Sequence, residues 1–117
     1  MKKEMFEKNP ILKLSFDFSI MVIAYCEHLE VEKKYIISRQ LLKSGTSIGA
    51  NAMEAQNAES KVDFIHKMKI AAKEADEMEY WLLLCSHSDG YANCDQLLND
   101  CTSIMKVLSK IISSSKF

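Results

Sequence analysis

Three histidines and sixteen acidic residues are the groups with which this chain of 117 residues could hold a metal ion. A di-metal carboxylate centre in a helical protein needs a Glu from each of two helices and a Glu-x-x-His pair from each of two others. The sequence has no Glu-x-x-His; Asp63 and His66 alone have a related spacing. No acidic residue stands three positions before His28 or His87. We therefore expect no metal and no cofactor, and histidines that lie at the surface or at helix ends.

The four cysteines offer a second possible chemistry, a zinc site or a reactive thiol. Cys85, His87, Cys94 and Cys101 could be drawn as zinc ligands, but their spacing matches no compact pattern of paired C-x2-C. No cysteine has a histidine and an acid arranged around it for nucleophilic catalysis. All four lie in apolar-periodic segments, which favours reduced thiols in or near the core of a cytosolic protein.

A polar stripe is the third candidate, because four polar residues recur at +3, +4 and +3. These are Ser44, Ser47, Asn51 and Glu54. The stripe could form an internal hydrogen-bond ladder, a seam between subunits or a ligand site. Glu54 and Glu77 could be drawn as an acid/base pair, but capping, pairing with lysines or fixing helix register is the favoured interpretation. We therefore predict no catalytic residue and no enzyme.

A basic band lies beside this stripe and is the candidate nucleic-acid-binding surface. Its members are Arg39, Lys43, Lys61, Lys67, Lys69 and Lys73. Such a band could bind phosphates. It could equally be a solvated face with i, i+4 pairs such as Lys73 with Glu77. The formal net charge of −1 gives no global electrostatic reason to bind nucleic acid.

Four helical segments would position these groups. We predict helices over about 10–31, 36–57, 61–87 and 93–114. Asn9 can cap the first helix and Pro10 suits its first position. Ser60 with Asp63 resembles a capping box at the start of the third. Short connections make consecutive helices antiparallel, so residues 1–117 are predicted to form one all-α domain, an up-down-up-down four-helix bundle.

The apolar residues predict which side of each helix is buried. The third helix has the clearest seam: Phe64, Met68, Ala71, Ala75, Met78, Leu82 and Cys85. The first helix has one stripe and three flanking residues: Ile11, Leu14, Phe18, Met21 and Tyr25, with Phe16, Ile20 and Ile23 beside them. The fourth helix has two stripes: Leu98, Cys101, Met105, Leu108 and Ile112, and Leu97, Ile104 and Ile111. The first and fourth helices thus each have more than one apolar stripe, and a monomer would leave one stripe exposed, which favours an oligomer.

Gly45 and Gly49 lie on one face of the second helix. Glycine is unfavourable inside a helix by roughly 1 kcal/mol relative to alanine. Close packing against another helix would offset this cost. No apolar stretch reaches the roughly 20 residues that a membrane span needs, and no leader with a convincing cleavage site is seen. A cytoplasmic protein without membrane contact is expected.

The segment from Ser38 to Leu84 resembles the family of four-helix bundle proteins named for intervening sequences in bacterial 23S ribosomal RNA. The resemblance is carried by Ser38-Arg39-Gln40-Leu41, Thr46-Ser47-Ile48, Asn51, Glu54-Ala55, Ser60, Asp63-Phe64, Ala71, Lys73-Glu74-Ala75, Glu77 and Tyr80-Trp81-Leu82. It implies a protomer that assembles into a homopentameric barrel. It also implies kinship with the accessory variability determinant proteins of retroelements, which bind nucleic acid and associate with a reverse transcriptase.

Two functions follow as hypotheses. The first is a non-enzymatic homo-oligomeric module that binds RNA or DNA through the basic band, with a reverse transcriptase or another protein as a further partner. The alternative is a protein-interaction scaffold with no nucleic-acid role, which the near-zero net charge favours.

Overall fold

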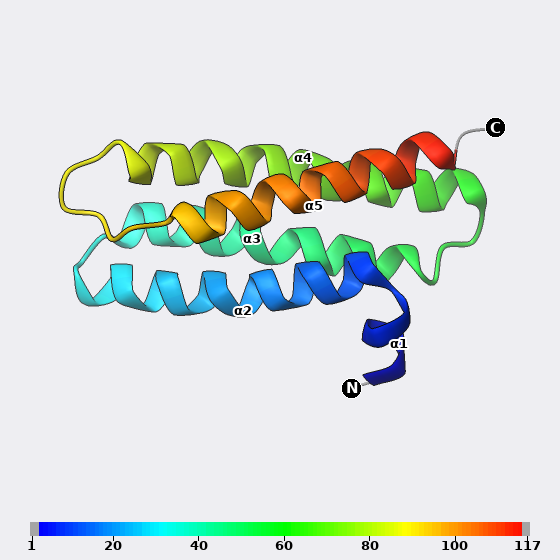
Figure 1. Cartoon of the computed structure of the whole chain (residues 1–117), viewed down its shortest axis with the longest axis horizontal. Helices are drawn as coiled ribbons and strands as arrows, with labels where there is room; N and C mark the ends of the chain where they lie inside the picture. Colours follow the sequence, from blue (N-terminus) through cyan, green and yellow to red (C-terminus); the bar gives the residue numbers. More distant parts are fainter. Residues whose placement is uncertain (1–2, 116–117) are drawn as a thin grey trace.

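The computed structural model describes residues 3–115, and every secondary-structure element in that range is a helix. A short helix precedes four long ones: α1 (Lys3–Lys8), α2 (Pro10–Val31), α3 (Tyr35–Ala55), α4 (Lys61–Ser86) and α5 (Asp95–Ser114). Consecutive long helices run in opposite directions along a body of 46 × 28 × 20 Å (Figure 1). They pack in the cyclic order α2, α3, α4, α5, and α5 also contacts α2. The all-helical prediction is confirmed.

The helix limits lie within two residues of the predicted ones, with one addition. Helix α1 was not predicted; Phe6 on it packs against Phe16 of α2 with ring centroids 4.9 Å apart. Helix α5 begins two residues later than predicted, because the Asn93 side chain accepts the Asp95 N–H at 2.9 Å and holds a turn there. No helix within residues 3–115 is long and apolar enough to cross a membrane.

The two predicted N-caps have different outcomes. Ser60 Oγ accepts the Asp63 N–H at 3.1 Å, and the Asp63 carboxylate accepts the Glu59 N–H at 3.2 Å. Asn9 occupies the predicted N-cap position of α2 with extended backbone, but its side chain makes no capping hydrogen bond. Its side-chain amide donates instead to Gln56 Oε1 at 3.2 Å, which ties the start of α2 to the residue after α3.

The core lies along the seam of α4 and the inner sides of the other long helices. Every seam residue from Met68 to Cys85 is at most 3% exposed, and Phe64 is half-buried. The second stripe of the last helix is not left over, since Leu97 and Ile104 of α5 are both buried inside the protomer. The argument for an oligomer from this stripe was therefore wrong, because α5 packs against both α4 and α2.

The buried side of α2 differs from the predicted stripe by a rotation of the helix. Its core residues are Ile11, Leu12, Ser15, Phe18, Val22, Cys26 and Leu29. Leu14, predicted to be buried, is 38% exposed. The rotation places Ser15 against Gly49 and Val22 against Gly45, where small residues of α3 leave room.

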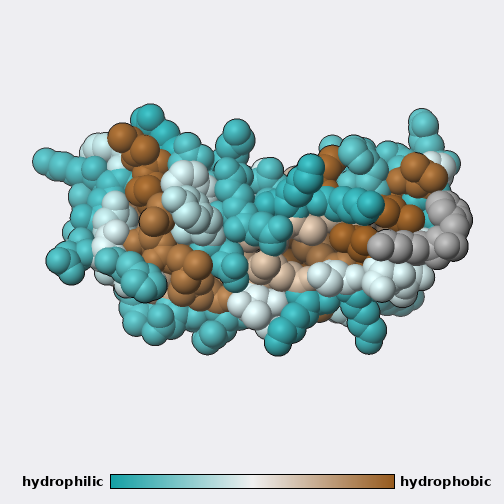
Figure 2. Space-filling view, turned by 90° about the horizontal axis from the view of Figure 1, so that it is seen from above, coloured by the Kyte–Doolittle hydropathy of each residue, from teal (hydrophilic) through white to brown (hydrophobic). Residues whose placement is uncertain are grey.

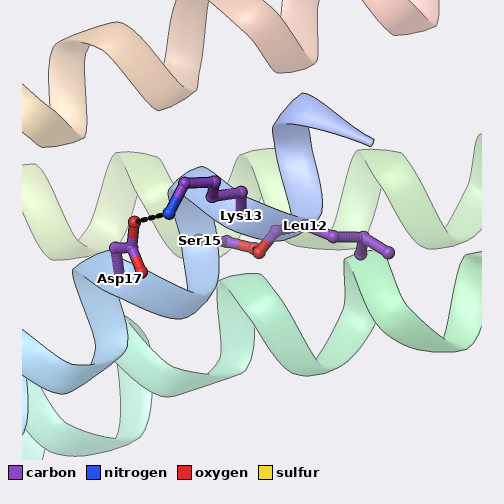
Figure 3. Close-up of polar contacts among 4 residues, drawn as sticks. All are labelled: Leu12, Lys13, Ser15 and Asp17. Atoms are coloured by element: carbon purple, nitrogen blue, oxygen red, sulfur yellow. Dashed lines mark hydrogen bonds and ion pairs between the residues drawn. The ribbon is translucent and has the colours of Figure 1, made fainter. Parts of the chain in front are cut away.

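Ser15 can be buried because its hydroxyl is satisfied within its own helix. Its Oγ lies 2.7 Å from the carbonyl oxygen of Ile11 and 3.3 Å from that of Leu12, so the hydroxyl donates to its own helix. Figure 3 shows Ser15 directed toward α3, whereas Lys13 and Asp17 pair with each other at 3.0 Å away from it. Polar side chains thus occupy both sides of α2 without leaving a buried hydroxyl unpaired.

Of the two glycines of α3, Gly45 is the more tightly packed against α2. A Cβ at this position would lie 2.9 Å from both methyl groups of Val22 and 3.1 Å from Met78 Cε. At Gly49 the nearest atoms belong to Ser15, at 3.3–3.4 Å. Gly45 therefore sets the separation of the two helices, and Gly49 tolerates more.

We predict that Gly45→Ala destabilises the protein by about 1–3 kcal/mol, because overpacking against a β-branched side chain exceeds the gain in helix propensity. Gly49→Ala is the matched control and should change the free energy of unfolding much less. Urea denaturation followed by circular dichroism measures both. A Gly45→Ala protein at least as stable as the parent would contradict the packing described above.

Candidate functional site

The basic band lies on the outer sides of α3 and α4, and part of it is already paired with acids. Lys67 Nζ is 3.9 Å from Asp63 Oδ1. The positive charge of Lys43 acts on the carboxylate of Glu74. Lys61 is exposed at the first position of α4. The band is therefore interrupted by acids.

Three members of the band remain available to a partner. Arg39, Lys69 and Lys73 are exposed, and none forms an ion pair within residues 3–115.

The polar stripe of α3 divides into residues that serve their own helix and one that bridges to α4. Ser47 Oγ donates to the Lys43 carbonyl at 2.6 Å, and Asn51 Nδ2 donates to the Ser47 carbonyl at 2.8 Å. The buried hydroxyl of Ser44 donates to Glu77 Oε2 at 3.1 Å and joins α3 to α4. The stripe thus acts mainly as a set of local hydrogen bonds.

Glu54 and Glu77, drawn above as an acid/base pair, are not brought together. Both are exposed. Glu77 lies at the level of Ser44, whereas Glu54 is ten residues further along α3, about 15 Å away at 1.5 Å per residue. These carboxylates cannot act on one substrate group.

Two polar atoms of α4 are buried without a partner in the described chain, which the sequence did not predict. Glu74 Oε2 and Trp81 Nε1 are buried and have no hydrogen-bond partner among the described residues. Burial raises the pKa of the Glu74 carboxyl, the charge of Glu77 raises it further, and Lys43 opposes both. Glu74 stands three residues after Ala71 and four before Met78. This spacing puts Glu74 beside the buried seam of α4 and could have predicted its partial burial from the sequence.

Two outer faces of the bundle expose large apolar side chains. The α2–α3 face is formed by Ile20 and Ile23 of α2 with Arg39 and Leu42 of α3. Its apolar members are 54%, 41% and 41% exposed. A groove of about 220 Å³ is lined by residues of α1, α2 and α3, among them Phe6, Phe16 and Met53.

The α4 face is formed by Glu74, Glu77, Tyr80, Trp81 and Leu84. Tyr80 is 57% and Leu84 37% exposed. The rings of Tyr80 and Trp81 are in edge contact, with centroids 5.4 Å apart. Figure 2 shows hydrophobic side chains exposed toward both ends of the bundle, with hydrophilic side chains around and between them. Large exposed apolar patches are uncommon on proteins that stay monomeric, and they often mark interaction sites.

The cysteines are structural. Sγ of Cys26, Cys94 and Cys101 each donates to a backbone carbonyl at 3.4 Å. No group of three or more metal-ligating side chains occurs in the part of the chain that the structure describes. Burial is the main cause that raises the thiol pKa, to about 11 in Cys85 and about 12 in Cys101. Protonated, hydrogen-bonded thiols are poor nucleophiles.

A family model described as "23S rRNA-intervening sequence protein" matches residues 7–110. The chain belongs to this family. A solved structure, a protein with unknown function from the S23 ribosomal protein family of Bacteroides thetaiotaomicron VPI-5482, is 41% identical with a TM-score of 0.83. The match covers 87% of this chain and 97% of that one. No curated protein matches significantly. The family match therefore confirms the resemblance that we inferred from residues 38–84.

Stability of this family member should fall in alkaline solution. The folded state keeps the thiol protons, whereas the unfolded chain loses them above the ordinary thiol pKa of 9.0. The stabilisation of the folded state by the buried, protonated thiols is therefore complete below about pH 9. It is lost as the pH rises toward the pKa of these thiols in the folded protein. We predict that Cys101→Ala makes the urea midpoint less dependent on pH between about 8 and 10.5. Ser86→Ala, at an exposed position, is the control; an unchanged dependence in Cys101→Ala would contradict this account.

Proposed function

We propose that the protein is a non-enzymatic module that assembles with copies of itself, five being the expected number, and serves as a protein-interaction scaffold in the cytoplasm. The observation that carries the proposal is the pair of separate apolar surfaces, the α2–α3 face and the α4 face, on one small protomer. Covering both requires two contacts per protomer, as in a ring. Four free, buried cysteines suit a reducing compartment.

The scaffold is favoured over nucleic-acid binding because of local charge. Lys43 and Lys67 have acidic neighbours, and the net charge of the chain is −1. A scaffold offers the outside of the assembly to another protein, for which a reverse transcriptase is the partner suggested by the family resemblance. Specific binding would then depend on shape and apolar anchors more than on salt.

RNA or DNA binding is the second candidate, supported by Arg39, Lys69 and Lys73. These cations are exposed and unpaired within residues 3–115, and an oligomer would repeat them around its circumference. The family's name mentions 23S rRNA, which keeps RNA among the partners to be tested. Phosphate contacts would make such binding fall steeply with salt.

We predict that the protein sediments as an oligomer, with five protomers expected. Analytical ultracentrifugation and native mass spectrometry measure the mass directly. A monomer at concentrations of about 10 μM and above would contradict the proposal, since an assembly of functional strength has a dissociation constant below that range.

Filter binding to RNA and DNA separates the two candidates. The scaffold predicts no retention at about 0.15 M salt. Retention that falls steeply with salt and disappears in an Arg39→Ala, Lys69→Ala, Lys73→Ala variant would establish the second candidate instead. Lys106→Ala with Lys110→Ala, both exposed on α5, is the matched control for loss of positive charge.

A further inference from the structure

A cavity of about 340 Å³ opens at the end of the bundle where α2 and α4 begin and α5 ends. Its apolar lining comes from three long helices: Ile11 of α2, Phe64 and Met68 of α4, and Val107 and Ile111 of α5. The volume lies at the small end of the range of about 300–1,000 Å³ that ligand pockets occupy, and the space between the helices of a bundle is a common place for such pockets.

The packing of the long helices explains why this space is open. Helices α2 and α5 share the smallest contact among the neighbouring pairs of long helices. Ile11 and Met68 are only 2% and 1% exposed, whereas Phe64, Val107 and Ile111 are half-buried. Apolar side chains that face an unfilled space lose dispersion contacts, and an apolar molecule in that space restores them. The cavity therefore favours a ligand with an apolar part.

The polar part of the lining favours an anion. Among the lining residues that the structure describes, Lys8 is the one charged residue; its neighbour Glu7 does not line the cavity. Lys8 is exposed and forms no ion pair within residues 3–115. Asn9 Nδ2 donates one hydrogen to Gln56 Oε1 at 3.2 Å, and the second hydrogen of this amide is available. The first turn of α2 has no acidic residue that would repel an anion.

We propose that this cavity binds a small amphipathic monocarboxylate of the medium-chain fatty acid type. Its tail would pack against Phe64, Met68 and Val107, and its carboxylate would accept hydrogen bonds from Lys8 and Asn9. The inference goes beyond the proposed scaffold function and does not depend on self-assembly, because no residue of the α2–α3 face or the α4 face lines the cavity.

The chemistry of the lining distinguishes this ligand class from its neighbours. A neutral apolar molecule would fill the space but leave the ammonium of Lys8 without a partner. A free phosphate would pair with Lys8 but leave the apolar walls uncovered. Hydrogen bonds to an ionised acceptor are stronger than those to a neutral one. A carboxylate on an apolar tail is the class that uses both parts of the lining.

The test follows the methionine methyl groups by NMR while octanoate is added to the parent protein. The Met68 methyl should shift saturably, with a dissociation constant of about 1 mM or below. The Met78 methyl, which packs beside Gly45 of α3, should shift little. Two further probes complete the comparison: 1-octanol, which has the same chain length without the charge, should bind about tenfold more weakly, and inorganic phosphate should give no saturable shift.

Two variants test the roles of the lining residues. Lys8→Leu should remove the preference for octanoate over 1-octanol, whereas Lys73→Leu, exposed on α4, is the matched control and should keep it. Val107→Phe should fill part of the cavity and weaken binding of both molecules about tenfold or more. Circular dichroism checks that each variant is folded.

The outcomes separate this inference from the proposed function. No saturable shift at Met68, or equal shifts at Met68 and Met78, overturns the site, and both are measured on the parent protein whether or not Val107→Phe folds. Equal affinity for octanoate and 1-octanol, or an unchanged preference in Lys8→Leu, overturns the carboxylate assignment. A monomer that binds octanoate as described overturns the proposed self-assembly alone, and an oligomer that does not bind it overturns this inference alone.

Discussion

The contact between Gly45 and Val22 is the constraint on which the rest of the molecule depends. It lets α2 approach α3 closely enough that Ser15, Val22 and Cys26 become the buried side of α2. A helix of fixed circumference that buries one side must expose another. Because Val22 faces inward, Ile20 and Ile23 are left on the outside, so the exposed α2–α3 face is a consequence of this close approach.

The same logic applies to α4, where the seam is built from small and flexible residues. Met78 lies beside Gly45 of α3, Glu74 interacts with Lys43 of the same helix, and Glu74 and Trp81 are partly buried. Their polar atoms lose water without gaining a partner inside the protomer. An unpaired buried polar group costs about 1–3 kcal/mol. Assembly that supplies the missing partners would recover part of that cost, which links the packing of the core to a surface contact.

Much of the fold could be predicted because local signals and packing agree. The heptad from Phe64 to Cys85 and the Ser60 cap both predict the same helix, and the structure has it. The rotation of α2 could not be predicted, since Leu14 and Ser15 are adjacent and hydrophobicity alone favours burying Leu14. That choice is made by the space beside Gly49, which is a property of two helices together.

The candidate site was harder to predict for a similar reason. Charge and spacing identified Arg39 and Glu77 but not their separation onto two faces. Trp81 offers the most direct test, because it is the only tryptophan in the chain and belongs to the α4 face. Its fluorescence should shift to longer wavelength when the assembled protein is diluted below its dissociation constant, and should not change with dilution in Leu42→Asp, which lacks an intact α2–α3 face and should stay a monomer. An emission maximum that stays constant while the measured mass falls would show that assembly does not cover the α4 face.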